Sequence, residues 1–316
     1  MKIFITGGAG FIGSHICEEL YNKIPNSKLL ILDKVTYAAN LKFISHLVRD
    51  KKRVKFIKAD IIDSIKYKSQ INNFDIAINV AAESHVDRSF RNSILFTKTN
   101  TLGAHIFFQT CLEKKVKKIV QVSTDEVYGE KLSGSFSEKN QLNPTNPYSA
   151  SKAAAEIIIG SYRYHFKSNI LIVRGNNIYG KRQFPEKLIP SCITKLIKNK
   201  PIEIHGSGKH IRCYLSAKDF AQAIYLLLKK KKRGVFNIGN NIYYKNIEIA
   251  EFICKKFKKD KKKYIRFVKD RPFNDRRYSV NINKIKKIGW KPKDSLKFDL
   301  DEIIRWYKNN INLFKI

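Results

Sequence analysis

Apolar runs alternate with amphipathic stretches over the first half of the chain. Each run is long enough for one buried strand, and these runs lie at residues 2–6, 29–32, 54–58, 75–80, 118–122 and 169–174. Helical spacing of apolar positions occurs between several of them, at about residues 11–23, 93–113 and 148–166. Alternating strands and helices predict a doubly wound parallel sheet. The fold class that we expect is therefore α/β of the Rossmann-like type.

The pattern changes after residue 174, where strand and helix no longer alternate regularly. Helices are expected at 185–199, 216–231, 246–257 and 299–309, with short strands at 202–205 and 235–238. We therefore expect two domains. Residues 1–174 would form the Rossmann-like domain, completed by a returning segment at about 213–236, and most of residues 175–316 would form a smaller α/β domain.

A glycine-rich turn, GGAGFIG, follows the first expected strand and opens the first expected helix. Gly7, Gly10 and Gly13 allow a tight turn and let the backbone approach a pyrophosphate, which the helix amino terminus can bind. Asp33 ends the second expected strand 20 positions after Gly13 (33 − 13 = 20). A carboxylate at that spacing binds the ribose of NAD and would repel the 2′-phosphate of NADP. The cofactor that the sequence predicts is NAD.

A hydroxyl and two adjacent carboxylic acids follow the fifth expected strand, as Thr124, Asp125 and Glu126. The carboxyl ends of parallel strands are where open α/β sheets bind ligands. Side chains alternate along an extended chain, so neighbouring acids there should have different surroundings and different pKa values. We expect this pair to supply a proton donor and a proton acceptor.

Tyr148 and Lys152 lie four residues apart in the next expected helix and would share one face of it. The ammonium group, with a nearby nicotinamide cation, should lower the pKa of the tyrosine and make it a base for an alcohol proton. Ala81 and Ala82, after the fourth expected strand, would let the backbone approach a flat ring. Such a Tyr-Lys pair is common on helix surfaces, but beside a dinucleotide fold it indicates oxidation of an alcohol.

Charge and cysteine content exclude several other classes of protein. The formal net charge is +35, from 62 Lys and Arg against 27 Asp and Glu. The basic residues stand in Lys-rich patches without interleaved aromatic residues, which disfavours nucleic acid as the principal partner. No run reaches the roughly 18 apolar residues of a membrane span, and no leader precedes the first strand, so we expect a cytoplasmic protein. The five cysteines and seven histidines form neither a disulfide framework nor a metal-ligand spacing.

The chain resembles the extended short-chain dehydrogenase/reductase superfamily over nearly its whole length and, within it, the nucleotide-sugar 4,6-dehydratases. The glycine turn and the Tyr-Lys pair identify only the superfamily. The Thr-Asp-Glu triplet is more specific, since related epimerases and decarboxylases lack the paired acids. The matching blocks are residues 6–13, 33–40, 81–88, 123–129, 148–152, 183–190 and 270–278.

The resemblance implies a mechanism. Tyr148, tuned by Lys152, would remove the proton of the C4 hydroxyl of a hexose while NAD accepts hydride from C4, and Thr124 would bind the same oxygen. Glu126 would then take the C5 proton, Asp125 would protonate the leaving C6 hydroxyl, and hydride would return to C6. The product would be a 4-keto-6-deoxy sugar nucleotide, as in deoxysugar and rhamnose biosynthesis. NAD would be regenerated in each turnover and could stay tightly bound.

The resemblance also implies a set of binding residues and a homodimer. The dimer would form through a four-helix bundle built from the helices near residues 93–113 and 148–166. NAD would be bound by Gly7, Gly10, Phe11, Ile12, Gly13, Asp33, Lys34, Thr36, Asp60, Ile61, Ala81, Ala82, Thr99, Tyr148 and Lys152. The nucleotide-diphosphate hexose would be bound by Ser84, Thr124, Asn177, Glu186, Lys187, Arg212, Asn237, Arg271 and Arg277.

The identity of the substrate stays open at this point. The runs from Arg174 to Gly180 and from Arg271 to Asp275 favour the UDP-glucose enzymes, because the typical dTDP-glucose enzyme has a different run before its Tyr-Gly. Cys213 replaces a position that is usually acidic. UDP-N-acetylglucosamine is an alternative substrate for the same reaction. More distant alternatives are a C4-epimerase or decarboxylase, and a nucleic-acid-binding protein built on the same fold.

Overall fold

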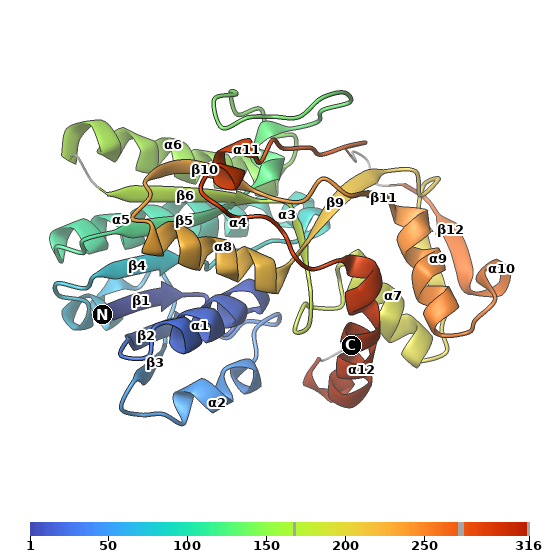
Figure 1. The fold of residues 1–316 in the computed structure, drawn as a ribbon, viewed down its shortest axis with the longest axis horizontal. Coiled ribbons are helices and arrows are strands. Elements are labelled where there is room, and N and C mark those ends of the chain that lie inside the picture. Colours follow the sequence, from blue (N-terminus) through green and yellow to red (C-terminus); the bar gives the residue numbers. More distant parts are fainter. Residues whose placement is uncertain (167–168, 271–274, 315–316) are drawn as a thin grey trace.

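A parallel sheet forms the centre of the larger part of the molecule (Figure 1). The computed structural model of the chain describes residues 1–166, 169–270 and 275–314. The strands of this sheet are β1 (Lys2–Thr6), β2 (Lys28–Asp33), β3 (Val54–Lys58), β4 (Ile76–Asn79), β5 (Ile119–Thr124), β6 (Ile170–Gly175) and β10 (Gly234–Ile238). Their order is β10-β6-β5-β4-β1-β2-β3, and every neighbouring pair is parallel. The expected doubly wound α/β fold is confirmed.

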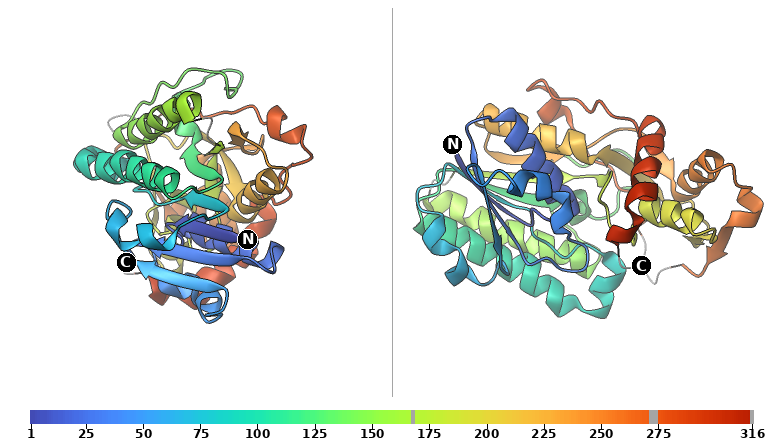
Figure 2. Two further views of the ribbon diagram at one scale, coloured as in Figure 1. Left: turned by 90° about the vertical axis from the view of Figure 1, so that its left-hand side faces the viewer. Right: turned by 90° about the horizontal axis from the view of Figure 1, so that it is seen from below.

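Helices cover both faces of this sheet (Figure 2). One face carries α1 (Phe11–Lys23) and α8 (Ala217–Lys229), and the short α2 (Ser45–Val48) lies beside β3. The other face carries α3 (Val86–Arg91), α4 (Ser93–Phe96), a π-helical segment η4 (Thr97–Leu102), α5 (Gly103–Glu113) and α6 (Pro147–Phe166). Successive side chains of β1 point to opposite faces of the sheet. Ile3 and Ile5 pack under α1 and α8, whereas Phe4 packs under α5 and α6.

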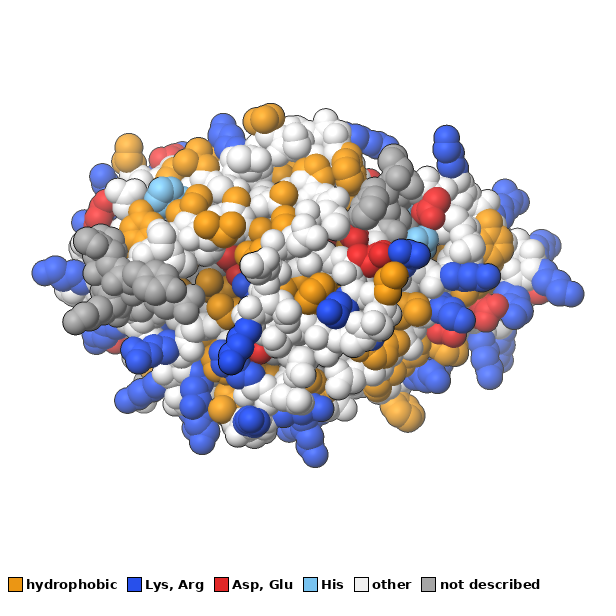
Figure 3. All heavy atoms as spheres, turned by 90° about the horizontal axis from the view of Figure 1, so that it is seen from above, with side chains coloured by type: hydrophobic (Ala, Val, Ile, Leu, Met, Phe, Trp, Pro, Cys, Tyr) orange, Lys and Arg blue, Asp and Glu red, His pale blue; other side chains and the backbone are white. Residues whose placement is uncertain are grey.

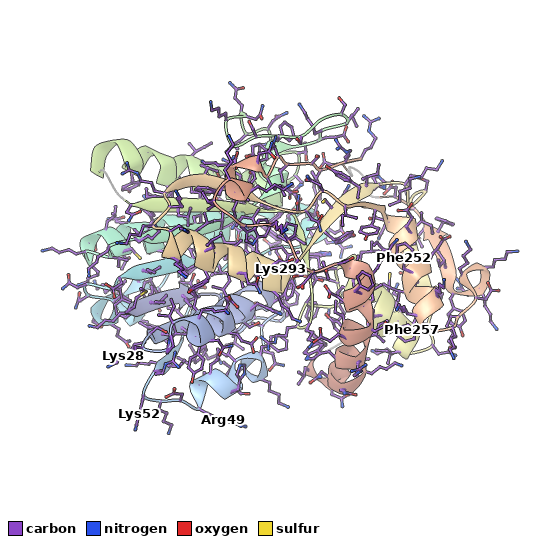
Figure 4. The ribbon with its side chains drawn as sticks, in the orientation of Figure 1. Lys28, Arg49, Lys52, Phe252, Phe257 and Lys293 are labelled. Carbon is purple, nitrogen blue, oxygen red and sulfur yellow. The ribbon has the colours of Figure 1, made fainter. Side chains whose placement is uncertain are left out.

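The smaller part lies beyond the carboxyl ends of the central strands and has its own core. Its strands are β7 (Asn177–Tyr179), β9 (Ile211–Ser216) and β11 (Tyr243–Lys245) in one sheet, and β8 (Ile202–His205) and β12 (Ile265–Val268) in another. Its helices are α7 (Leu188–Ile197), α9 (Asn246–Lys256), α10 (Lys261–Tyr264) and α12 (Leu296–Asn310). Phe252 and Phe257 (Figure 4) pack against the core that α7, α9 and α12 share. The short α11 (Asn283–Lys286) returns to β10.

Several elements differ from the expectation. The fifth strand continues through Thr124, two residues beyond the expected end, and then enters a 3₁₀ turn, η5 (Asp125–Tyr128). The long helix expected at 93–113 is interrupted by the π-helical segment, and α7 begins only at Leu188. Strands β7, β9, β11 and β12 were not predicted, because short strands such as β9 bury polar residues and lack a clear alternation.

Basic side chains are spread over the molecular surface. Figure 3 shows Lys and Arg scattered over the visible face and its outline, with few acidic groups between them. Lys28, Arg49 and Lys52 point outward from the region of β2, β3 and α2 (Figure 4). Among the residues described, no helix combines the length and the apolar character needed to cross a bilayer. All five cysteines are buried and carry free thiols.

Candidate active site

A cavity of about 320 Å³ lies at the carboxyl ends of the central strands, between the two parts of the molecule. It is the place where an open α/β sheet is expected to bind its ligands. Every residue expected to bind NAD or to act in catalysis lines this cavity. Those residues are Gly7, Gly10, Phe11, Ile12, Gly13, Asp33, Lys34, Thr36, Asp60, Ile61, Ala81, Ala82, Thr99, Thr124, Asp125, Glu126, Tyr148 and Lys152.

The glycine turn is packed too closely for any larger residue. Gly7 has φ +70°, and a Cβ built on it would lie 2.6 Å from the backbone nitrogen of Ala81. A Cβ on Gly13 would lie 2.0 Å from the carbonyl oxygen of Gly7. These contacts leave no room for a side chain at Gly7 or Gly13 and keep the turn at the start of α1 narrow. The cradle fits a pyrophosphate at a helix amino terminus.

Asp33 connects the glycine turn to the end of β2. Its carboxylate accepts hydrogen bonds from the backbone nitrogens of Ala9 at 2.9 Å and Val35 at 2.7 Å. Burial raises the pKa of Asp33, and these two N–H groups act in the opposite direction. Next to it, Lys34 and Asp60 form an ion pair of 2.7 Å. An acidic group therefore faces the part of the cavity beside the turn, which fits the ribose of NAD.

Asp125 and Glu126 have different surroundings, but not for the reason that the sequence suggested. Asp125 begins a 3₁₀ turn, in which successive side chains point about 120° apart, so the alternation of an extended strand does not apply. Asp125 is 3% exposed and accepts a hydrogen bond of 2.7 Å from Asn176. Glu126 is partly buried, and its Oε2 accepts a longer bond, 3.4 Å, from Asn146.

The pKa values of the two acids follow from these surroundings. Burial, reinforced by the charge of Glu126, raises the pKa of Asp125 to about 7. Burial also raises the pKa of Glu126, whereas the positive charges of Lys187 and Arg212 act to lower it. Asp125 can therefore hold a proton near neutral pH, while two positive charges offset part of the cost of ionising Glu126. This is the arrangement of a paired proton donor and acceptor.

The side chains around Tyr148 do not lower its pKa. Burial, and then the charges of Glu126 and Asp125, raise its pKa above the ordinary value, while the Thr124 hydroxyl acts in the opposite direction. The ammonium group of Lys152 donates to the carbonyl oxygen of Val122 at 2.7 Å, and burial lowers its own pKa to about 8. The protein groups around Tyr148 therefore do not produce the expected lowering of its pKa by Lys152. The remaining expected contribution is the positive charge of a nicotinamide ring.

The residues expected to bind the sugar nucleotide divide into two groups. Ser84, Asn177, Glu186 and Lys187 line the cavity together with Thr124. Lys187 donates to the carbonyl oxygen of Ser84 at 2.7 Å, which joins the smaller part to the loop after β4. The Tyr37 hydroxyl donates to Glu186 at 2.9 Å. These contacts hold Glu186 and Lys187 against the segments that follow β2 and β4.

Three of the other expected residues, Arg212, Asn237 and Arg277, do not line the cavity. Arg212 is 8% exposed with its guanidinium over the Tyr278 ring, yet its charge influences both acids of the turn. Asn237 is completely buried, accepts from the Tyr128 hydroxyl and donates to two backbone carbonyls. Arg277 donates to the carbonyl oxygens of residues 131 and 134. Arg271 lies outside the described residues.

Two groups of site residues were missed in the sequence. Asn176 and Asn146 contact the two acids, although nothing about either asparagine in the sequence distinguishes it from a loop residue. Beneath the site, Arg174 and Glu156 form a buried ion pair of 2.5 Å, and Arg174 also donates to the Tyr128 hydroxyl. A charged residue in an otherwise apolar strand, as Arg174 is in β6, was the available signal for this pair.

Comparison with known proteins identifies the family. A family model described as GDP-mannose 4,6 dehydratase matches residues 4–304. The dTDP-D-glucose 4,6-dehydratase of Dictyostelium discoideum is 40% identical over 98% of this chain and 82% of its own length. A trifunctional UDP-glucose 4,6-dehydratase of Arabidopsis thaliana is also 40% identical over 98% of this chain, which spans only 47% of that protein.

Solved structures agree with this family. The crystal structure of DesIV, a dTDP-glucose 4,6-dehydratase from Streptomyces venezuelae with NAD and TYD bound, has a TM-score of 0.96 and 34% identity, covering 100% of this chain and 99% of that one. The chain belongs to the extended short-chain dehydrogenase/reductase superfamily. Within that class it is a member of the nucleotide-sugar 4,6-dehydratase family, and the activity that the comparisons support is that of an NDP-glucose 4,6-dehydratase, a hydro-lyase. The predicted family and enzyme class are thereby confirmed.

Proposed function

We propose that the protein converts a nucleoside-diphosphate glucose, carrying uridine or thymidine, into its 4-keto-6-deoxy derivative, with Asp125 as acid and Glu126 as base. The observation that carries this assignment is the contrast between the two acids. Asp125 is enclosed with a pKa of about 7, whereas Glu126 is less buried and lies under the additional influence of Lys187. Relatives that act on each of the two nucleotides are equally similar to this chain, at 40% identity.

NAD would be bound in this cavity beside the glycine turn and Asp33, both of which line it. The chemistry supplied there by bound NAD is the reversible acceptance of a hydride, from C4 of the hexose and later back to C6. Because the cofactor ends each turnover in its starting state, it has no need to leave, and we propose that it stays tightly bound. Glu186 and Lys187, from the smaller part, would hold the sugar nucleotide over it.

The residues of the chain account for the proton transfers. Tyr148 accepts the proton of the C4 hydroxyl, and Thr124 binds the same oxygen. The ketone formed at C4 acidifies the C5 proton, which passes to Glu126. Asp125 gives its proton to the C6 hydroxyl as the C6–O bond breaks, and water leaves. Burial of Asp125 keeps the required proton available at neutral pH.

The pH dependence of turnover should show the titration of Asp125. Its raised pKa, about 7, means that the acid is protonated at lower pH and loses its proton as the pH rises through that value. We expect kcat to fall by about tenfold per pH unit above this point, because the protonated form is the active one. The charged and titratable groups that face it are Glu126, Arg212, Tyr148 and Cys213. Initial rates measured from about pH 6 to about pH 9 check this, and a flat profile would contradict it.

Incubation with UDP-glucose, dTDP-glucose and UDP-N-acetylglucosamine tests the proposed reaction. The absorbance that a 4-keto sugar develops in alkali identifies the converted substrate, and mass spectrometry should show the loss of one water. We expect one or both glucose nucleotides to react. Conversion of the N-acetylglucosamine compound alone would replace the proposed substrate, and no reaction with any of the three, after saturation with NAD, would refute the proposal.

We also propose that the protein forms a homodimer through the helices behind the sheet. Large apolar side chains are exposed there, with Ile94 on α4 at 75%, Leu102 in the π-helical segment at 47% and Ile157 on α6 at 65%. These elements pack against one another, so the three side chains belong to one helical layer. An exposed apolar surface of this kind is typical of a protein–protein interface.

Replacing Ile157 with glutamate should convert the dimer to a monomer. The charged side chain would be buried without a partner in the assembled interface, which is strongly unfavourable. Sedimentation equilibrium gives the mass directly. Phe298→Glu is the matched control, because Phe298 is also exposed (85%) but lies on α12. A monomeric wild type, or a dimeric Ile157→Glu variant, would contradict the proposed interface.

A further inference from the structure

Asn176 is fixed in one orientation against Asp125. It follows β6, lines the cavity and is 5% exposed. Its Nδ2 lies 2.7 Å from Oδ2 of Asp125, and its Oδ1 lies 2.9 Å from the backbone nitrogen of Asn240. A backbone N–H can only donate, so the side-chain oxygen of Asn176 must face Asn240. The group that faces Asp125 is therefore the NH₂ group, and an amide flip would leave two donors facing each other.

This contact determines which oxygen of Asp125 carries the proton. In a protonated carboxyl group the carbonyl oxygen is the stronger acceptor, so the short bond from Asn176 favours Oδ2 as the carbonyl oxygen and places the proton on Oδ1. Thr124, which lines the same cavity, donates its hydroxyl to Oδ1 at 3.4 Å, and this hydroxyl can rotate to accept instead when Oδ1 carries the proton. The proton is thus on the side of Asp125 nearest the residue that would bind the C4 oxygen.

We propose that Asn176 is a positioning residue for water elimination, which holds the acidic proton of Asp125 on Oδ1 and directs it to the C6 hydroxyl of the hexose. This inference rests on the proposed function. In the step concerned, the C5–H bond breaks, its proton passes to Glu126 and its electron pair forms the C5–C6 double bond. The C6–O bond breaks toward oxygen, the Asp125 proton moves to that oxygen, and water departs. Asp125 is left as a carboxylate.

Gly239 provides an independent way to disturb this contact. A Cβ built on Gly239 would lie 1.8 Å from Oδ1 of Asn176, and Gly239 does not line the cavity. Gly239→Ala would therefore displace the Asn176 amide without removing a polar group from the site. Asn176→Leu removes the hydrogen bonds while keeping a side chain of similar size. The two variants act on one contact by different physical means.

The test compares two leaving groups. UDP-glucose and dTDP-glucose lose hydroxide from C6, which needs a proton, whereas their 6-deoxy-6-fluoro analogues lose fluoride, which leaves without one. We expect Asn176→Leu to lower kcat for the hydroxyl substrates about 10- to 100-fold and to change kcat for the fluoro analogues less than about threefold. Gly239→Ala should produce the same selective loss, to a smaller extent. Absorbance of the retained NAD establishes that each variant is folded.

The outcomes separate the inference from the function on which it rests. An equal loss with both leaving groups, or no loss, would overturn the positioning role while leaving the dehydratase assignment intact. A wild-type protein that converts neither glucose nucleotide would refute the proposed function itself. If Asn176→Leu fails to fold, Gly239→Ala decides the matter by the same comparison.

Discussion

Glu126→Gln should abolish dehydration while leaving the cofactor in place. The substitution keeps the size of the side chain and removes its ability to accept the C5 proton, so we expect kcat to fall by about 10²- to 10⁴-fold. Glu126 stands in the turn after β5, whereas the glycine turn and Asp33 stand at β1 and β2, so NAD binding should be unaffected. The decisive measurement is exchange of the C5 proton in heavy water, followed by mass spectrometry.

A second glutamate in the same region provides the control. Glu130 is four residues further along and pairs with Arg276 at 3.1 Å at the surface. Glu130→Gln makes the same chemical change outside the cavity and should retain wild-type exchange. Undiminished C5 exchange in Glu126→Gln would exclude this residue as the base. Loss of exchange in both variants would point to a structural effect on the whole segment.

Loss of the buried ion pair should have the largest effect on stability. The side chains of Arg174 and Glu156 are 6% and 3% exposed, so each charge depends on the other for compensation. Glu156→Gln would leave the Arg174 guanidinium buried and unpaired, and we expect the free energy of unfolding to fall by about 3–5 kcal/mol. Denaturant unfolding followed by circular dichroism measures this change.

A solvent-exposed ion pair tests whether burial is the cause of the large expected loss of stability. Lys195 and Glu203 are 2.6 Å apart, with the glutamate 56% exposed. Glu203→Gln should lower the free energy of unfolding by no more than about 1 kcal/mol, since water screens exposed pairs. Similar losses in the two variants would mean that the buried pair contributes no more than a surface one. Glu156 also raises the pKa of Lys152, so its loss should lower that pKa further.

The sequence predicted the parts of the molecule that depend on local pattern. Apolar runs and the glycine turn were sufficient for the central sheet and for the part of the cavity that the turn and Asp33 line, because each of those features is determined within a few residues. Thr124, Asp125 and Glu126 were found by their place at the end of the fifth expected strand. The 3₁₀ geometry of the turn could not be predicted, since an extended chain and a 3₁₀ turn can begin with the same residues.

Features that depend on distant partners could not be predicted. Asn176 meets Asp125 across 51 residues and Asn240 across 64, and no periodicity reveals such a meeting. Asn237 was expected at the substrate, but its amide is satisfied inside the core by Tyr128 and two carbonyl groups. The pKa of Tyr148 was expected to fall because Lys152 is four residues away. Burial and the charges of the two acids instead determine its direction.

The position of the acid pair in a turn, outside the strand framework, has an evolutionary consequence. The turn η5 continues directly from β5, where the Thr124 hydroxyl caps it, and packs against α6, and the chain leaves the turn at Gly129, where φ is +80°. A few codon changes in that turn could therefore alter the acid pair, while the sheet and the glycine turn stayed as they were. New reactions in such a fold can arise at the end of one strand without substitutions in the buried core.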